Sequence, residues 1–205
     1  MLEPIPDRIE PGIWVAQEVV AGERLTIPID LIVPEGFATG GGRRGARLGA
    51  HGKRAARRTL GLEAALIDNG VMTIKALDAT DLREISVKVA GKTALLIAKA
   101  HKIHDRVATG RADRVGDKDA SDVYRLMQTT APAETAEIVR ELLGDPIASQ
   151  PTRLALQYLQ ELFGSRGAPG VQMAIRALRL AISEDEIAVL TTSFAGSLRE
   201  ALGAS

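Results

Sequence analysis

The residues best suited to chemistry are cations and carboxylates at helical spacing in the middle of the sequence. Residues 92–107 have the pattern of an amphipathic helix, and Lys99 and Lys102 lie on its cationic stripe. Lys99 also adjoins the apolar stripe, so it is the cation best placed to point into a cleft. Asp119 and Asp122 follow about twenty residues later, one helical turn apart. These side chains either contact phosphate or form solvated and capped helix faces, and the spacing leaves both interpretations open.

A further carboxylate, Asp30, lies in the apolar run Ile29 to Val33. A carboxylate within a buried strand is costly unless it is paired, hydrogen-bonded or bound to a metal. Mg²⁺ prefers oxygen ligands, so Asp30 is a candidate metal ligand. An ion pair with an arginine is the competing interpretation. His101, His104 and Asp105 have spacings that share a helix face, but no third strong ligand or H-E-x-x-H pattern accompanies them. We expect a surface cluster rather than a metal site.

The segment 36–61 is rich in glycine and arginine and contains no acidic residue. Glycines let a backbone approach phosphate closely, and guanidinium groups match phosphate oxygens in pairs. Its spacing fits neither a P-loop nor a dinucleotide-binding fingerprint. It is therefore either a loop that contacts phosphate or RNA, or a solvated loop neutralised by acids elsewhere. Its cations are Arg43, Arg44, Arg47, Lys53, Arg54, Arg57 and Arg58.

Composition excludes several classes of protein. The 205 residues carry 26 Lys and Arg against 26 Asp and Glu, so any attraction to nucleic acid depends on a local patch. Cysteine is absent, which excludes disulfides, zinc ribbons and thiol nucleophiles. The first residues do not resemble a signal peptide, and no apolar run reaches the roughly 18–20 residues that span a bilayer. We therefore predict a cytoplasmic protein without membrane contact.

The elements that must position these residues change type along the chain. Strand patterns are confined to the first 90 residues, and helical patterns continue from there to the end. We predict an α+β fold, with a small, mostly antiparallel sheet in residues 1–90 and a helical region in residues 91–205. The predicted strands cover 13–16, 25–33, 72–77 and 85–89, and the predicted helices cover 92–107, 118–130, 133–143, 151–163, 169–181 and 184–202.

Several of these segments together resemble the second half of AbiEii-type nucleotidyltransferases. These are bacterial abortive-infection and type IV toxin enzymes with a DNA polymerase β-like fold, and the mycobacterial MenT toxins are related to them. Their late motifs are a lysine on a helix and then a K/R-D-x-x-D-[LV]-Y-x-L segment. The matching residues here are Lys99, within Ala94 to Lys102, and the string Lys118-Asp119-Ala120-Ser121-Asp122-Val123-Tyr124-Arg125-Leu126. The run Ile29 to Val33 resembles the strand that carries the third acid of that fold.

The resemblance implies an enzyme that transfers nucleotides from an NTP to an RNA acceptor, often tRNA, with Mg²⁺ as cofactor. It also implies a toxin of a toxin–antitoxin or phage-defence system, with a cognate antitoxin as a protein partner. Asp30 would be the third metal-side acid and Lys99 a phosphate-contacting cation. Either Asp119 or Asp122 would orient the lysine or the nucleotide, and the resemblance leaves the choice open.

The sequence departs from the family before Asp30. The family has a Gly-Gly/Ser turn and an Asp-x-Asp pair ahead of the third acid, and the 29 residues before Asp30 contain no Gly-Ser and no Asp-x-Asp. We therefore expect a partial nucleotidyltransferase fold that is incomplete or inactive as this chain. The alternatives are a non-enzymatic RNA- or DNA-binding module that uses the arginine-rich segment, and a protein-interaction partner.

Overall fold

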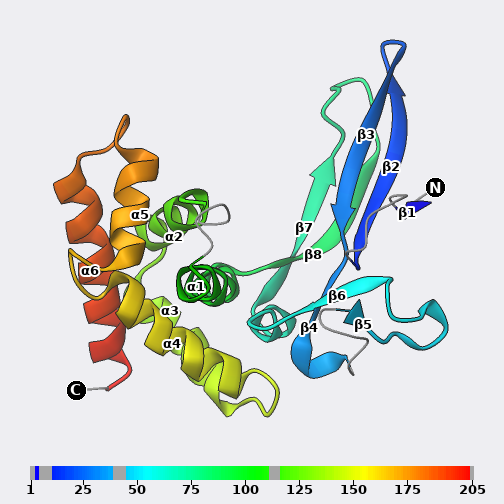
Figure 1. Ribbon diagram of the computed structural model, residues 1–205. Helices are drawn as coiled ribbons and strands as arrows, with labels where there is room; N and C mark the ends of the chain where they lie inside the picture. Colours follow the sequence, from blue (N-terminus) through cyan, green and yellow to red (C-terminus); the bar gives the residue numbers. More distant parts are fainter. Residues whose placement is uncertain (1–2, 5–10, 39–44, 111–115, 204–205) are drawn as a thin grey trace. The chain divides into compact units, whose positions relative to one another are not determined.

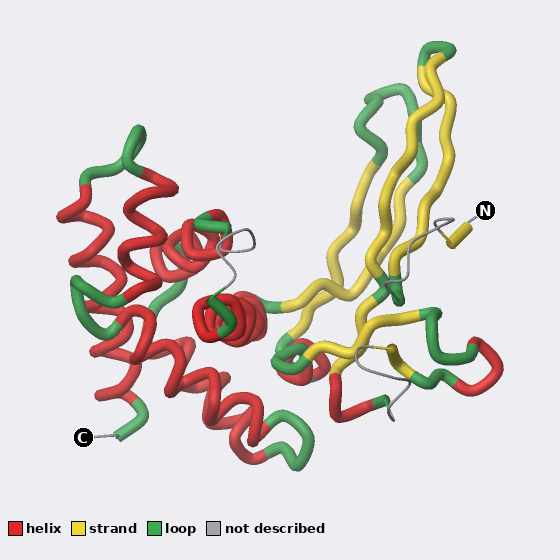
Figure 2. The backbone as a smooth tube through the Cα atoms, in the orientation of Figure 1, coloured by secondary structure: helices red, strands yellow, loops and turns green. Residues whose placement is uncertain are grey.

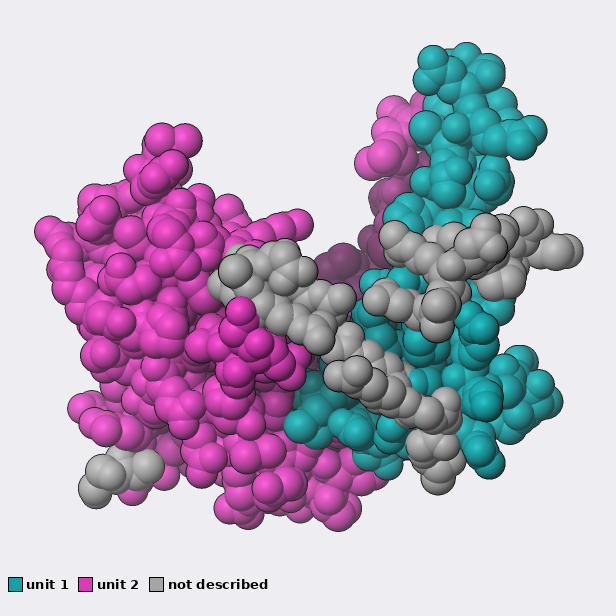
Figure 3. All heavy atoms as spheres, in the orientation of Figure 1, with its two compact units in different colours: residues 1–62 teal, residues 63–205 magenta. Residues whose placement is uncertain are grey.

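The fold is α+β, as the periodicity of the sequence predicts, with strands first and helices afterwards (Figure 1). A computed structural model describes residues 3–4, 11–38, 45–110 and 116–203. The chain divides into two units, residues 1–62 and residues 63–205 (Figure 3). The predicted division at residue 90 follows the change from strand to helix, whereas the units part earlier and leave the second strand pair with the helices.

The first unit begins with a long hairpin. Strand β2 (Ile13–Val20) pairs with β3 (Glu23–Asp30) and with the short β1 (Glu3–Pro4), in the order β1-β2-β3. The turn consists of Ala21 and Gly22, both with positive φ, the geometry of a tight two-residue hairpin turn. In this sheet β3 is an edge strand, and an edge tolerates Pro28, which has no N–H to donate to a neighbouring strand.

A second small sheet joins β4 (Ile32–Pro34), β6 (Ala56–Thr59) and β5 (Gly45–Ala46), in the order β4-β6-β5. Two short 3₁₀ helices, η1 (Glu35–Phe37) and η2 (Gly49–His51), lie in the connections between β4 and β6. Strand β4 runs parallel to β6, and β5 runs antiparallel to it.

The predicted continuous strand 25–33 is wrong, because the chain changes sheets at Leu31. The Leu31 N–H donates to the Gly12 carbonyl at 2.7 Å, and the Leu31 carbonyl accepts from the Arg57 N–H at 2.9 Å. Leu31 therefore bonds to residues outside the β2–β3 ladder and separates β3 from β4. Asp30 consequently lies at the end of a strand rather than inside one.

The second unit opens with η3 (Glu63–Leu66) and a hairpin of β7 (Asn69–Lys75) and β8 (Glu84–Ala90). The register pairs Met72 with Val87 and Ile74 with Ile85, which gathers apolar side chains on one face. Met72 and Ile74 are about half exposed. This hairpin is the second strand pair that the sequence predicts.

Helices make up the rest of the second unit (Figure 2). Their bounds lie close to the predicted ones. The Ser183 hydroxyl accepts from the Glu186 N–H and so caps the N-terminus of the last helix. The helices are α1 (Lys92–Ala108), α2 (Lys118–Gln128), α3 (Pro132–Gly144), α4 (Ser149–Phe163), α5 (Pro169–Leu178) and α6 (Glu184–Ala201). No helix in the described part of the chain is long and apolar enough to cross a membrane.

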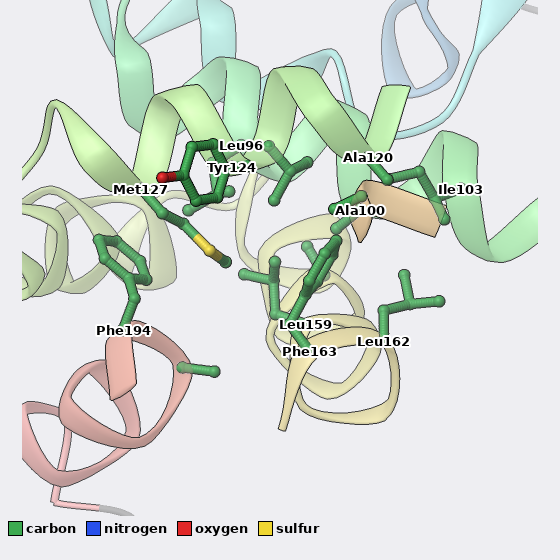
Figure 4. Packing of buried hydrophobic residues seen from close by; sticks show 14 of the residues in the cluster. Leu96, Ala100, Ile103, Ala120, Tyr124, Met127, Leu159, Leu162, Phe163 and Phe194 are labelled. Atoms are coloured by element: carbon green, nitrogen blue, oxygen red, sulfur yellow. The ribbon is translucent and has the colours of Figure 1, made fainter. Parts of the chain in front are cut away.

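The main hydrophobic core lies among these helices (Figure 4). Helix α1 contributes Leu96 and Ile103, α2 contributes Tyr124, and α4 contributes Phe163, all at most 3% exposed. Fully burying a side chain such as leucine or isoleucine stabilises a fold by about 1.5–3 kcal/mol. This packing fixes α1 and α2 against each other, and these are the two helices that carry the candidate site.

Asp68 secures the junction between the hairpin and α1. Its carboxylate accepts from the Ala94 N–H at 2.7 Å, and its carbonyl accepts from the Gly91 N–H at 2.7 Å. A Cβ at Gly91 would lie 1.9 Å from the Asp68 carboxylate. Asp68 therefore accepts a hydrogen bond from an N–H in the first turn of α1 that has no partner within the helix.

Candidate functional site

One face of α1 carries three cations that converge on the start of α2. Lys99, Lys102 and Arg106 are spaced three and four residues apart, which places them on one side of a helix. The neighbouring face of α1 packs into the core through Leu96 and Ile103. The cations consequently lie along the border between the core and the solvent.

Asp119, in the first turn of α2, accepts hydrogen bonds from all three cations. The amino groups of Lys99 and Lys102 lie 2.7 Å and 2.9 Å from its Oδ1. The Arg106 guanidinium donates to its Oδ2. The position of Asp119 at a helix N-terminus also favours its negative charge. The capping interpretation therefore explains only part of its environment.

Asp122 completes the cluster one turn further along α2. Its Oδ2 accepts from Lys99 at 2.7 Å, and its Oδ1 lies 3.3 Å from Arg125. Lys99 therefore donates to both aspartates of the K-D-x-x-D string. The structure brings together four of the residues that the sequence singles out, which are Lys99, Lys102, Asp119 and Asp122.

The electrostatics of the cluster follow from its burial. The Asp119 side chain is only 6% exposed. Burial is the largest influence on its pKa and opposes the charged form, but hydrogen bonds from Lys99 and Lys102 outweigh it, so the pKa lies below its ordinary value. Burial likewise opposes the charged form of Lys99, yet its bonds to both aspartates raise the pKa of its amino group. Both groups are therefore charged at neutral pH.

The cluster retains an excess of positive charge and of hydrogen-bond donors. Lys99, Lys102, Arg106 and Arg125 face two carboxylates, which leaves a net charge of +2. Each lysine has three N–H donors and arginine has five. Within the described contacts Lys99 uses two of its donors, and Lys102 and Arg106 use one each. The arrangement can therefore bind a multivalent oxyanion such as a phosphate chain.

Further contacts fix the start of α2 from its other side. The Arg176 guanidinium of α5 donates to both oxygens of Asp117, at 2.8 Å and 3.1 Å. This pairing raises the pKa of Arg176. Val123 and Tyr124 are fully buried, so the inner face of α2 is held by the core. The C-terminal helices thus support the carboxylates of the site.

Asp30 has a different environment from the one that its sequence context suggests. It lies in the first unit, its side chain is 53% exposed, and its Oδ2 lies 3.6 Å from Arg57. The expectation of a carboxylate buried within an apolar strand is therefore wrong, because the strand ends at this residue. The competing interpretation of an ion pair with an arginine is confirmed.

The described residues do not fit a complete magnesium centre. Within the part of the chain that the structure describes, no three His, Asp or Glu side chains are grouped so that they could hold a metal ion. Magnesium requires near-octahedral oxygen coordination, and Asp30 with Arg57 beside it supplies a single carboxylate. No chemical step can be derived through a metal from these residues.

Only part of the arginine-rich segment is an exposed cationic surface. The Arg58 guanidinium donates to the Gly45 carbonyl at 3.1 Å and lies 3.5 Å from Glu35, which ties β6 to its neighbours. Arg57 is paired with Asp30. The remaining candidates with described side chains, Arg47, Lys53 and Arg54, are exposed. Arg43 and Arg44 lie outside the described residues.

Sequence reasoning gave no site role to Arg106 and Arg125, although both complete the cluster. Their helical spacing from Lys102 and Asp122 is the signal that could have found them. The expected surface location of His101 is wrong. His101 is 7% exposed, its Nε2 is hydrogen-bonded to the Pro151 carbonyl, and burial lowers its pKa.

Searches of family models, of curated proteins and of solved structures find no match to this chain.

Proposed function

We propose that this chain is a nucleotidyltransferase-family protein whose Lys99 cluster binds the phosphates of an NTP. The observation that carries the proposal is the double hydrogen bond from Lys99 to Asp119 and Asp122, each at 2.7 Å. The resemblance to AbiEii-type enzymes depends on these same motifs, the lysine on a helix and the K-D-x-x-D string. Their contact in space supports a common task for residues about twenty positions apart in the sequence.

The reaction that the resemblance implies is transfer of a nucleotide from the NTP to the end of an RNA such as tRNA, and we propose that this chain keeps the phosphate site but is inactive in the transfer. Such a reaction needs positive charge around the phosphate oxygens as negative charge shifts to the leaving group. Lys99, Lys102 and Arg106 supply it, and Asp119 holds them at fixed positions. The resemblance implies Mg²⁺ as cofactor, but we assign it no residue and no step, because the described residues do not fit a metal centre.

The biological role in the proposal is that of a toxin in a toxin–antitoxin or phage-defence system. An RNA acceptor and a cognate antitoxin would be its macromolecular partners. The exposed cations Arg47 and Lys53 favour an approach of RNA to the first unit through phosphate contacts. The role of a toxin rests on the family resemblance alone.

The binding test is calorimetric titration of the protein with each of the four NTPs. We expect Lys99→Ala to weaken binding about tenfold or more, the effect of losing a charge-assisted bond to phosphate. Lys102→Ala should have a smaller effect, because Lys102 contacts one aspartate and its side chain is 48% exposed. Lys88→Ala, an exposed lysine of β8, is the matched control and should leave binding unchanged. Equal effects of all three substitutions would mean a generic basic surface and would refute the assignment.

Transfer itself is tested with radiolabelled NTPs and a tRNA pool. We expect NTP binding but no labelled tRNA, because the described residues do not form a metal centre. A labelled tRNA band that depends on Lys99 would show that the chain is active and would overturn this expectation.

A second candidate function, binding of RNA or DNA without catalysis, is favoured by the excess of cations in the arginine-rich segment. The described cations Arg47, Lys53 and Arg54 are exposed, and no acid lies between residues 36 and 61. Arg47→Glu with Lys53→Glu should weaken RNA binding and reduce the log–log salt slope by about 0.7 per lost phosphate contact on a single strand. RNA binding that is unchanged by this pair would exclude the segment as the binding surface.

A further inference from the structure

The two aspartates of the cluster differ in how firmly each is held. Asp119 is 6% exposed and accepts from three cations. Asp122 is 29% exposed, accepts from Lys99 at 2.7 Å, and has a longer contact of 3.3 Å with Arg125. Water can solvate Asp122 if it leaves Lys99, whereas Asp119 would lose its charge partners without comparable access to solvent.

Lys99 has limited capacity to accept a new partner. Its amino group has three N–H donors, and two of them are directed at the aspartates. A phosphate oxygen and a carboxylate oxygen are both anionic acceptors, and they compete for the same donors. A phosphate chain that engages Lys99 fully must therefore displace one carboxylate, and the more exposed one is easier to displace.

Asp122 also has another partner within reach. The Arg125 guanidinium, 58% exposed, lies 3.3 Å from Asp122 Oδ1 and 3.2 Å from the Ser121 hydroxyl. If Asp122 releases Lys99, its negative charge can remain paired with Arg125 on the same helix face. Its departure would also reduce repulsion between the carboxylate and an arriving phosphate.

We propose that Asp122 occupies Lys99 in the ligand-free protein as an internal competitor, and that a phosphate group of the NTP displaces it. Asp119 stays in place as a positioning residue that keeps Lys99, Lys102 and Arg106 together. This inference rests on the proposed function, because it assumes that the cluster takes a phosphate chain. It assigns different roles to the two aspartates, which the sequence leaves undivided.

The test is titration of the full chain with sodium tripolyphosphate in buffer without divalent cations. Asp122→Asn and Asp119→Asn each remove one negative charge from the cluster, so the net charge of the cluster changes by the same amount in both variants. We expect Asp122→Asn to bind about fivefold tighter, the scale of a partly exposed ion pair. We expect Asp119→Asn to bind tripolyphosphate about tenfold more weakly, because Lys99, Lys102 and Arg106 lose the carboxylate that holds them close together. Glu137→Gln, an exposed acid on α3, is the charge-matched control and should not change binding.

The outcomes separate this inference from the proposed function. If the unmodified protein binds tripolyphosphate and Asp122→Asn binds equally or more weakly, the competitor role is wrong while the phosphate site stands. If both aspartate variants bind more tightly, net charge alone governs the site, and the positioning role of Asp119 is wrong. If neither the unmodified protein nor Asp122→Asn binds, the phosphate site and the inference fail together.

Circular dichroism of each variant checks that it is folded. Should Asp119→Asn fail to fold, Asp119→Glu keeps the charge and is expected to retain binding within about threefold. A folded Asp119→Glu that binds as poorly as a Lys99→Ala variant would overturn the positioning role. Because Asp122 is more exposed, we expect Asp122→Asn to fold, and this variant decides the competitor role.

Discussion

The stability of the helical region should depend on Asp119 far more than on other acids nearby. Replacing Asp119 by alanine removes the common acceptor of Lys99, Lys102 and Arg106. Breaking a fully buried ion pair costs about 3–5 kcal/mol, and an exposed pair contributes about 0–1 kcal/mol. Asp119 is buried, but its cations are 23–48% exposed and regain some hydration. We therefore expect a loss of about 2–3 kcal/mol for Asp119→Ala, a discounted value between those limits.

The assay is urea unfolding followed by circular dichroism at 222 nm, which reports the helices of the second unit. Asp105→Ala is the control, because Asp105 is an exposed acid on α1. It should change the unfolding free energy by less than about 0.5 kcal/mol. In a thermal scan, a loss of this size for Asp119→Ala corresponds to about 4–12 °C at about 2–4 °C per kcal/mol.

The pH dependence provides an independent check on the same reasoning. The folded-state pKa of Asp119 is lowered, so its contribution is present above the unfolded pKa of about 3.9 and is lost as pH falls through the folded pKa. The difference between Asp119→Ala and the unmodified protein should therefore shrink toward pH 3. A difference at pH 7 no larger than that of the Asp105 control would refute the account of the cluster.

Three further predictions concern residues outside the cluster. Gly12→Ala should destabilise the first unit by about 2 kcal/mol or more, because Gly12 has φ +83° and a Cβ would lie 2.5 Å from the Leu31 carbonyl oxygen. The fluorescence of Trp14, the only tryptophan in the sequence, reports this unfolding. Asp68→Ala should cost about 1 kcal/mol in urea unfolding by removing the acceptor of the Ala94 N–H, and an unchanged midpoint would show that water replaces the carboxylate. The pKa of His101 is lowered by burial, so stability should fall as pH drops below about 6.5, and His101→Gln should flatten that dependence between pH 7 and pH 5.

The secondary structure of this protein could be predicted well from its sequence because the elements are local in origin. The helices from residue 92 onward follow apolar periodicity, and most of them end near a glycine or a proline. The β7–β8 hairpin follows strand patterns on each side of a polar turn. The α+β class follows directly from this order. Such patterns depend on neighbours a few residues apart, which a sequence displays.

The end of β3 at Asp30 could not be predicted in the same way. Residues 25–33 read as one apolar run, and the break at Leu31 arises from hydrogen bonds to Gly12 and Arg57, far apart in the sequence. The position of Asp30 at a strand end, exposed and beside Arg57, follows from that break. The burial of His101 could not be predicted for a similar reason. Its ring contacts the Pro151 carbonyl and the Tyr158 ring of α4, which lie about fifty residues away in the sequence.

The sequence by itself determined which residues of the candidate site share a helix face, because helical geometry sets the spacing of Lys99, Lys102 and Arg106. It also determined that Asp119 and Asp122 lie one turn apart on the following helix. Only the tertiary structure decided that the two faces meet, and that Asp119 is buried with three cations while Asp122 remains partly exposed. The physical reason is that the packing of α1 on α2 sets the burial of each carboxylate, and that packing depends on core contacts from across the whole second unit.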